Sequence, residues 1–333
     1  MATTPLTLTA AVRSHGGALP LVNGAIAMDG LRLDWIKVEP QIAAYRKMVR
    51  DLAYDVCELA PTTYLCARAF NKQFTAIPVF LTRDFHHRSV VCNVTSGIKE
   101  PKDLEGKTFG VRAYTVTTGV WTRGILESEY DVDPARVTWY TDDEEHVTEW
   151  VPPPNVVKVP PGESLASMIA AGRLDAALSG AAGIGRSGPP TANWEVAAAQ
   201  AIAAPRSAPL APLFPDARAL EVAWYRRTKI FPIHGLIVIK NAVLAERPWI
   251  ARELLRAFQA SKELHLKHLA AAGPSTADDR HVIETQEMIG GSDPLPFGLE
   301  ANRPTIEALI QYAYSQKIIP AKVRPADVFA PTA

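Results

Sequence analysis

The sequence predicts an α/β protein of two lobes with a ligand cleft between them. Strand-like apolar runs alternate along the chain with amphipathic helical patterns. The chain has 333 residues, of which 47% are hydrophobic and 21% charged, and this is enough for two separate cores. A strand-like run at 88–94 leads out of the first lobe, and another at 231–240 returns to it. Lobe one is therefore expected at 1–95 plus 230–333, and lobe two at 96–229.

Lobe one opens with short strands that alternate with helices. The run LTLTAAV alternates polar and apolar side chains, as a half-buried strand does, and PTTYLCARAF begins with a proline, which suits the first turn of a helix. Strands are expected at 6–12, 31–38, 54–60, 74–82 and 88–94, and helices at 41–52 and 61–70. After the returning strand, helices are expected at 247–269 and 304–316.

Lobe two is expected to hold strands at 108–113, 136–141 and 174–180, and a helix at 163–173 that ends at a glycine. Two further stretches fit no element. The stretch 142–161 is acidic and then rich in proline, which predicts a surface excursion. The stretch 181–219 is rich in Gly, Pro and Ala, and an irregular region of this length is typical of a lid or an oligomer arm. On this ground a homo-oligomer is expected.

The charge balance excludes some classes of partner. Lys+Arg and Asp+Glu are 35 each, so neither nucleic acid nor an anionic membrane surface is expected to bind. No apolar run is long enough to span a membrane, and the first residues lack the basic and apolar regions of an export signal. The 3 cysteines form no CxxC pair, and their odd number favours a reducing, cytoplasmic location.

The stretch YTVTTGVWTRGIL, at 114–126, predicts an anion site. Its Thr- and Gly-rich turn opens a helix, where unpaired N–H groups and the helix dipole both favour negative charge. Hydroxyl donors are added by Thr115, Thr117 and Thr118. The neighbouring arginines add positive charge, so the turn is expected to bind a carboxylate.

Residues at the ends of the predicted strands are candidates for a site in the cleft. They are rich in Arg, His and hydroxyl groups, and two or more guanidinium groups favour a ligand with more than one carboxylate. The catalytic candidates are Glu58, His86, His87 and His234. The substrate-binding candidates are Arg13, His15, Arg83, Arg112, Tyr114, Thr117, Thr118, Gly119, Arg123, Ser179 and Arg226.

Some of these candidates also fit a purely structural role. Arg83 could pair with the acid that follows it, and Arg123 could pair with Glu127, four residues on in the same helix. His86 and His87 would point to opposite sides of an extended strand, so at most one of them would reach the cleft.

The remaining histidines leave alternatives open as well. His234 fits a site role or a satisfied core imidazole equally well, and His265 and His268 fit a solvated helix face better than a metal pair. No spacing typical of a metal site, a nucleotide-binding loop or a serine-hydrolase elbow occurs, so neither metal nor cofactor is expected. Convergence on a metal stays open for four residues, namely His15, Glu58, His87 and His234.

Five segments, taken together and in order, resemble the 4,5-dihydroxyphthalate decarboxylase family. They are ELAPTTYL, IPVFLTRDFHHRS, PKDLEGKTFGVRAYTVTTGVWTRGIL, GRLDAALSG and FPIHGLIVIKNAVLAERPWIARELLRAF. PKDLEGK and LDAAL are shared across type II periplasmic-binding-protein-like folds, and the resemblance implies that fold. FxxRS, YxxTxGVWxRG and FPIHxLIVI are more specific to the decarboxylases. The stretches 142–161 and 181–219 match least, and they leave the choice of substrate open.

The resemblance also implies a reaction. It is the non-oxidative loss of CO2 from a dihydroxylated aromatic diacid, 4,5-dihydroxyphthalate, to give protocatechuate in phthalate breakdown, and it needs no organic cofactor. The retained carboxylate would be held by Arg13, Arg112 or the turn 117–119. The phenolic proton would be taken by Glu58 or a histidine. The ring carbon would be protonated by His86, His87 or His234.

A solute-binding protein or a sensor for an aromatic carboxylate is the alternative. The same fold and the same anion site serve binding without chemistry, so the fold alone does not decide between them. In either case the expected partner is a small aromatic dicarboxylate.

Overall fold

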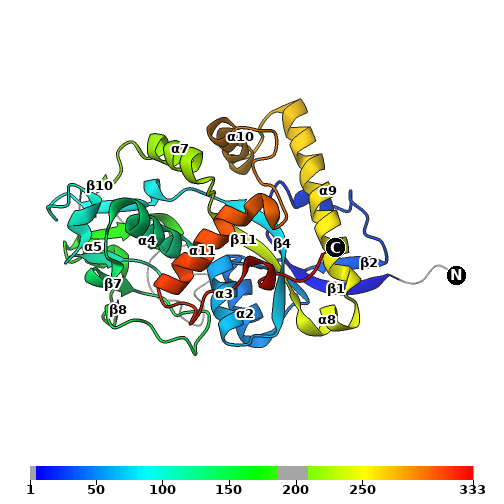
Figure 1. Cartoon of the computed structure of the whole chain (residues 1–333), viewed down its shortest axis with the longest axis horizontal. Helices are drawn as coiled ribbons and strands as arrows, with labels where there is room; N and C mark the ends of the chain where they lie inside the picture. The colour runs from blue at the N-terminus through cyan, green and yellow to red at the C-terminus, as the bar shows by residue number, and fades with distance from the viewer. Residues whose placement is uncertain (1–4, 186–208, 333) are drawn as a thin grey trace. The chain divides into compact units, whose positions relative to one another are not determined.

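A computed structural model describes residues 5–185 and 209–332 of the chain. The chain divides into two compact units. Unit 1 comprises Met1–Asp84, Tyr225–Glu307 and Val323–Ala333, and unit 2 comprises Phe85–Trp224 and Ala308–Lys322. Each unit is built around its own sheet (Figure 1).

The sheet of unit 1 has five strands in the order β2-β1-β3-β11-β4. Their bounds are β1 Leu6–Ala11, β2 Leu31–Trp35, β3 Val56–Leu59, β4 Phe74–Arg83 and β11 Ile233–Lys240. The first three strands are parallel, whereas β11 runs antiparallel to both of its neighbours. The register of β11 against β4 shifts around Gly235, which marks an irregularity next to the ends of these strands.

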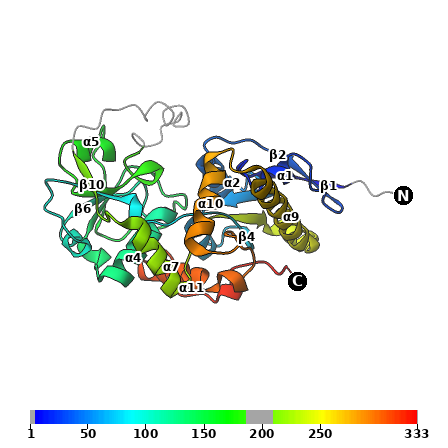
Figure 2. The ribbon, with the colours of Figure 1, turned by 90° about the horizontal axis from the view of Figure 1, so that it is seen from above.

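Helices cover both faces of this sheet. The helices of unit 1 are α1 Leu19–Val22, α2 Ile42–Asp51, α3 Pro61–Ala69, α8 Asn241–Glu246, α9 Trp249–Ala272 and α10 Ala277–Ile289. The long α9 lies along one side of the sheet (Figure 2). Its Ile250, Leu254 and Phe258 pack into a continuous apolar core with side chains from all five strands. Alternate side chains of a strand point to opposite faces, and α2 contacts β3 while α3 contacts β11 and β4.

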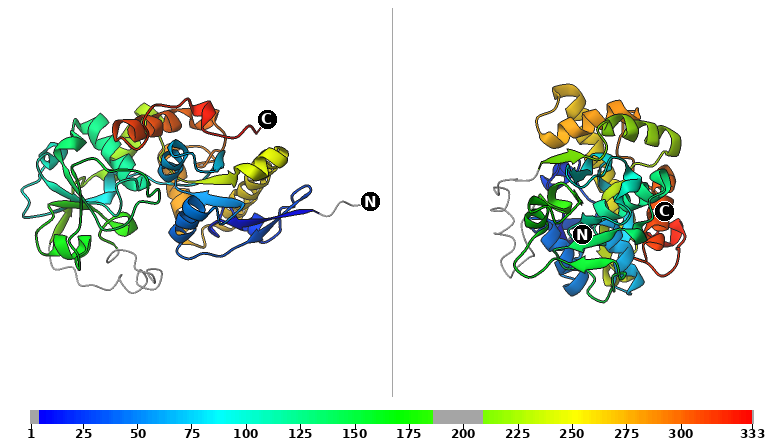
Figure 3. Two further views of the ribbon diagram at one scale, coloured as in Figure 1. Left: turned by 90° about the horizontal axis from the view of Figure 1, so that it is seen from below. Right: turned by 90° about the vertical axis from the view of Figure 1, so that its left-hand side faces the viewer.

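The sheet of unit 2 has six strands in the order β10-β5-β9-β6-β7-β8. Their bounds are β5 Val90–Asn93, β6 Thr108–Gly110, β7 Thr138–Thr141, β8 Val156–Lys158, β9 Ala176–Leu178 and β10 Leu210–Pro212. The helices α4, Thr117–Tyr130, and α5, Leu165–Ala170, lie on opposite sides of this sheet (Figures 2 and 3). Two helices begin in one unit and end in the other, namely α7 Ala217–Thr228 and α11 Arg303–Ser315.

Most predicted elements are confirmed, and three regions differ from the prediction. The acidic half of the stretch 142–161 is not a surface excursion, because Asp142, Asp143 and Trp150 are buried, whereas the proline-rich half, 151–161, has no buried residue and contains β8. The stretch 181–219 contains β10 and the start of α7, while residues 186–208 lie outside the described part of the chain. The helix α10, with a Thr276 cap, occupies a region for which the sequence predicted no element.

Candidate functional site

An ionic pair in unit 1 joins the ends of two neighbouring strands. Glu58 lies on β3 with its side chain fully buried, and Arg13 follows β1. The Arg13 backbone N–H donates to Glu58 Oε2 at 3.0 Å, while Nε and Nη2 donate to Oε1 at 3.0 and 2.5 Å. The Arg13 side chain as a whole remains 44% exposed.

Three further residues close around the buried carboxylate. The Tyr45 hydroxyl donates to Glu58 Oε1 at 3.2 Å, and Arg13 Nη2 donates to the Thr82 hydroxyl at 3.3 Å. A Cβ on Gly235 would lie 2.7 Å from Glu58 Oε1 and 2.8 Å from Thr82 Oγ1, so only glycine fits there. No pattern in the sequence predicted that Tyr45 and Thr82 contact this pair, because these contacts depend on packing between segments that are distant in the sequence.

This geometry changes the role expected for Glu58. Burial raises the pKa of its carboxyl, but the charge and hydrogen bonds of Arg13 outweigh burial and lower the pKa below its usual value. Burial lowers the pKa of the Arg13 guanidinium, and the Glu58 charge more than reverses that effect. The pair is therefore ionised, and a carboxylate that already accepts four hydrogen bonds suits holding Arg13 in place better than accepting a substrate proton.

Two histidines accompany this pair in unit 1. His15 lies in the turn after β1, and its Nε2 atom is buried with no hydrogen-bond partner in the described part of the chain. Burial lowers the pKa of His15, against the raising effect of Glu58. His234 precedes Gly235 on β11, and burial lowers its pKa to about 4. Both imidazoles are consequently neutral at pH 7, which makes them proton acceptors in the free protein.

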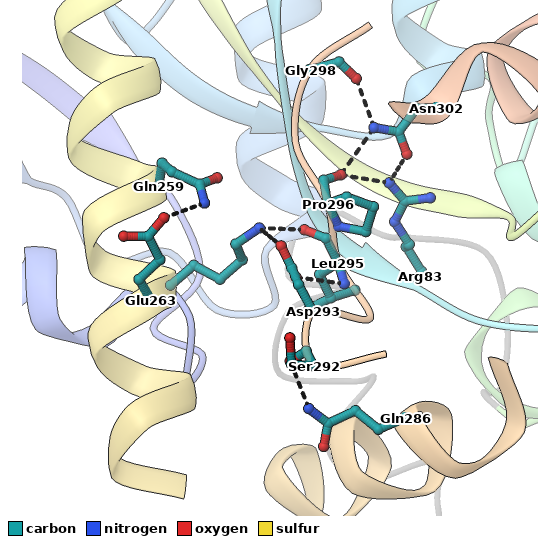
Figure 4. A network of polar contacts seen from close by, with 11 residues as sticks. Arg83, Gln259, Glu263, Gln286, Ser292, Asp293, Leu295, Pro296, Gly298 and Asn302 are labelled. Atoms are coloured by element: carbon teal, nitrogen blue, oxygen red, sulfur yellow. Dashed lines mark hydrogen bonds and ion pairs between the residues drawn. The ribbon is translucent and has the colours of Figure 1, made fainter. Parts of the chain in front are cut away.

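Arg83 was expected to bind substrate, but its guanidinium is committed to the protein itself (Figure 4). Nη1 donates to the Phe231 carbonyl at 3.1 Å, and Nη2 donates to the Pro296 carbonyl at 3.0 Å and to the Asn302 amide oxygen. The Asn302 amide in turn donates to the carbonyls of Pro296 and Gly298 at 2.9 and 2.7 Å. Burial lowers the pKa of Arg83 to about 9. Arg83 thus fastens the loop before α11 to the end of β4.

Part of the predicted anion site of unit 2, at residues 114–115, is occupied by the chain's own carboxylate. Glu145 accepts from the backbone N–H groups of Tyr114 and Thr115 at 2.6 and 3.2 Å, and from the Thr115 hydroxyl. Likewise, Arg112 is buried and forms an ion pair with Asp143 at 3.1 Å. Both acids come from the stretch that the sequence predicted to lie on the surface, and they bind two of the groups that were expected to bind a ligand.

Arg123 is also part of the framework of unit 2. Its side chain is fully buried, with Nε donating to Gln316 Oε1 at 2.8 Å and Nη2 donating to the Tyr114 carbonyl. The guanidinium stacks on the Tyr114 ring at 3.7 Å from its centroid. The alternative pairing with Glu127 is therefore wrong. Of the remaining residues of this turn, Thr117 and Gly119 are buried in the first helical turn of α4, and Thr118 is partly exposed.

The two adjacent histidines do not lie on a strand. His87 opens a short 3-10 turn before β5, and both His86 and His87 are 2% exposed. Aromatic rings surround the His87 imidazole, with centroids at 5.2 Å for Phe214, 5.9 Å for Trp224 and 6.0 Å for Tyr130. Burial lowers its pKa to about 4. This enclosure by aromatic rings favours a packing role for His87 over a catalytic one.

The last two candidates occupy positions at the ends of elements. Ser179 follows β9 and is partly exposed, and Arg226 is exposed in the last turn of α7. Of the proposed metal-binding set, His15, Glu58 and His234 lie in unit 1 and His87 in unit 2. Within residues 5–185 and 209–332, no group of three or more His, Cys, Asp or Glu side chains is arranged to hold a metal ion. No helix in these ranges is long and apolar enough to cross a membrane.

Comparison with known proteins finds relatives of one kind. No protein-family model matches the chain. A 4,5-dihydroxyphthalate decarboxylase of Comamonas testosteroni is 27% identical over 339 residues, covering 98% of this chain and 97% of that protein. A 4,5-dihydroxyphthalate decarboxylase of Pseudomonas putida is 33% identical over 181 residues, covering 52% of this chain and 70% of that protein.

Solved structures with a similar fold include binding proteins. The aliphatic sulphonate-binding protein SsuA of Escherichia coli has a TM-score of 0.52 and 10% identity, with 98% of each chain covered. The alkanesulfonate-binding protein SsuA of Xanthomonas axonopodis pv. citri, bound to MOPS, has a TM-score of 0.51 and 11% identity, with 98% of this chain and 99% of that chain covered. At such identities these structures show the fold alone, and they confirm the expected periplasmic-binding-protein-like, two-lobed α/β class.

Proposed function

The chain belongs to the 4,5-dihydroxyphthalate decarboxylase family, and we propose that it is a carboxy-lyase that converts 4,5-dihydroxyphthalate to protocatechuate and CO2. The observation that carries this proposal is the alignment with the Comamonas testosteroni decarboxylase, which runs through nearly the whole of both chains. The cluster of Arg13, His15, Glu58 and His234 in unit 1 offers groups of the kind this reaction needs.

Arg13 is the proposed binding residue for the carboxylate that stays on the ring. Its guanidinium is held through the Nε and Nη2 side by Glu58, while 44% of the side chain is exposed. A planar guanidinium fixed in this way binds a carboxylate with a defined orientation. Glu58 is thus a positioning residue in this proposal, and Tyr45 supports it from α2.

His15 and His234 are the proposed proton-transfer residues. Their imidazoles are neutral in the free protein, and a bound dianion would raise the pKa of any imidazole close to it. One neutral imidazole can accept the phenolic proton, and an imidazolium formed on substrate binding can protonate the ring.

The reaction balances without an oxidant or a reductant. The hydroxyl para to the departing carboxylate loses its proton to the base, and the carboxylated ring carbon gains a proton, which gives a cyclohexadienone. The bond from that carbon to the carboxylate then breaks, CO2 leaves, and the electron pair restores the aromatic ring as a phenolate. The base returns its proton to the phenolate, so the net change consumes one proton and one carboxylate.

The direct test is turnover by the purified protein. We expect 4,5-dihydroxyphthalate to disappear and protocatechuate to accumulate in amounts well above the enzyme concentration, measured by liquid chromatography. Phthalate, which lacks the para hydroxyl, is the matched control and should not react. Tight binding of 4,5-dihydroxyphthalate in calorimetry without product would instead favour a solute-binding protein. A parallel sample treated with chelator tests for a metal requirement.

We also propose a cytoplasmic location, on the basis of Cys57, Cys66 and Cys92, which are free and buried. Free thiols persist in a reducing compartment. A homo-oligomer stays a prediction, because it depended on a loop of which residues 186–208 lie outside the described part of the chain. Size-exclusion chromatography with light scattering tests it.

A further inference from the structure

The turn that carries His15 rests directly on an imidazole of α9. A Cβ placed on Gly16 would lie 2.4 Å from His265 Nε2 and 2.5 Å from His265 Cε1, so the backbone of Gly16 is in close contact with the ring. The same helix holds the next turn of the chain, because the Leu21 N–H donates to the Ser261 hydroxyl at 3.0 Å. The turn from β1 into α1 is therefore shaped by α9.

An acid on α10 lies beside the His265 imidazole. Its Nε2 atom lies 3.4 Å from Asp279 Oδ1, and both side chains are largely buried. The other oxygen of Asp279 accepts from the backbone and hydroxyl of Ser275 and from the backbone of Thr276, each at 2.9 Å. These bonds fix the carboxylate at the start of α10 and lower the pKa of Asp279 to about 2, against the effect of burial, which raises it. Asp279 is thus a fixed negative charge beside His265.

Charged groups from four elements surround the two histidines. His15 is influenced by Glu58 on β3, Arg13 in its own turn, Asp278 on α10 and His265 on α9. His265 is influenced by Asp279 and Asp278 on α10 and by His268 on α9. The sequence had placed His265 and His268 together on a solvated face. In the structure His268 is exposed, whereas His265 turns inward towards Gly16.

We propose that His265 and Asp279 form a positioning pair that holds the His15 turn in its working geometry for decarboxylation. This inference rests on the proposed function, because His15 is one of the two proposed proton-transfer residues. Neither His265 nor Asp279 needs to touch the substrate. The carboxylate orients the imidazole, and the imidazole supports the backbone of Gly16 and hence the direction of the His15 side chain.

The first test compares variants of the two histidines on α9. His265→Ala should lower kcat/KM roughly ten- to a hundredfold, because a misplacement of about 1 Å at the reacting groups can cost about a hundredfold. His265→Gln keeps an N–H donor near Asp279 and should retain most of the activity. His268→Ala, at an exposed position one turn away, should match the wild type. Equal losses in His265→Ala and His268→Ala, or none in either, would overturn the proposal.

The second test is independent of turnover. The titration of His15 can be followed by NMR of its imidazole, identified by comparison with His15→Gln. His265→Ala should let His15 protonate at higher pH than in the wild type, because a competing imidazole is lost and water enters. An unchanged His15 titration would contradict the proposal that His265 and Asp279 position the His15 turn. If wild-type protein does not decarboxylate 4,5-dihydroxyphthalate, the proposed function fails, while this titration still decides the positioning role.

The third test uses the contact itself. Gly16→Ala should reduce kcat/KM, because the new Cβ collides with His265. In the double variant Gly16→Ala/His265→Ala the collision is gone, so adding Gly16→Ala to His265→Ala should cause little further loss. Fully additive losses would contradict the direct contact. Thermal unfolding of each variant separates misfolding from a change in the site.

Discussion

At the scale of the single residue, the Arg13–Glu58 pair places a buried, ionised carboxylate in the candidate site. Glu58 is fully buried, so removing its counter-charge should be costly, whereas removing both charges should not. Arg13→Met is expected to lower the free energy of unfolding by about 3 kcal/mol, and Arg13→Met/Glu58→Gln to recover most of that loss. Both variants should lack activity, because each has lost the Arg13 guanidinium that is proposed to bind the substrate carboxylate.

Urea unfolding at pH 7 gives the stabilities, and chromatography gives the activities. Full stability of Arg13→Met would show that Glu58 does not depend on the arginine. Activity in the double variant would remove Arg13 from the proposed mechanism.

His87 makes a prediction about the pH dependence of stability. Burial lowers its pKa from 6.5 in the unfolded chain to about 4 in the folded protein, so the unfolded state binds the proton more tightly. The stabilisation that His87 contributes to the folded state is complete above pH 6.5, and it is lost as the pH falls towards 4. Between pH 7.5 and 4.5 the loss amounts to roughly 2–3 kcal/mol.

His87→Phe keeps an aromatic ring among Phe214, Trp224 and Tyr130 but cannot take up a proton. We expect its unfolding free energy to fall less than that of the wild type over this pH range, as measured by chemical denaturation at each pH. Parallel curves for the two proteins would show that His87 is not the group responsible.

Four of the candidate residues were identified by their position in the sequence. The predicted ends of strands drew attention to Arg13, His15, Glu58 and His234, and in the structure all four stand at or near the ends of strands of one sheet. The positions of Tyr45 and Asp279 could not be predicted in this way. Their contacts depend on how helices pack over the sheet, and the local hydrophobic periodicity of the sequence does not determine that packing.

At the scale of the element, hydrophobic periodicity predicted the regular strands and helices. It did not predict the burial of a polar segment in which a few large side chains pack against the rest of the protein. The stretch 142–161 reads as solvated, yet Trp150 stacks on Tyr114 with centroids 5.7 Å apart and its Nε1 donates to the Lys317 carbonyl. The polar composition of this segment therefore gave no indication that the stacking of Trp150 on Tyr114 and the Arg112–Asp143 ion pair hold it against the protein.

The irregular register of β11 makes a second prediction at this scale. Gly235→Ala should disturb the strand ends around Glu58, since the added Cβ would lie under 3.0 Å from both Glu58 and Thr82. We expect a loss of activity and a fall of roughly 1–3 kcal/mol in unfolding free energy from overpacking. Gly17→Ala is the matched control, because its nearest atom would be 3.9 Å away. Equal behaviour of the two variants in urea unfolding would count against the close packing at Gly235.

At the scale of the whole molecule, the thiols report on global unfolding. Cys57, Cys66 and Cys92 are 0%, 1% and 5% exposed, and burial raises the pKa of Cys92 to about 12 and that of Cys57 well above its usual value. Thiolates are the reactive form of cysteine. We therefore expect a thiol reagent to modify none of the three cysteines in the native protein and all three in denaturant. A thiol that reacts quickly and stoichiometrically under native conditions would contradict this burial.

The insertion of β11 between β3 and β4 has a consequence for synthesis on the ribosome. β4 ends at Arg83, whereas β11, the strand beside it in the sheet, ends at Lys240. At about 5–20 residues per second, this interval lasts roughly 8–30 s. During that time two apolar strands emerge with unpaired edges, which are templates for aggregation. Recombinant yield is therefore expected to rise with the supply of chaperones that shield nascent chains.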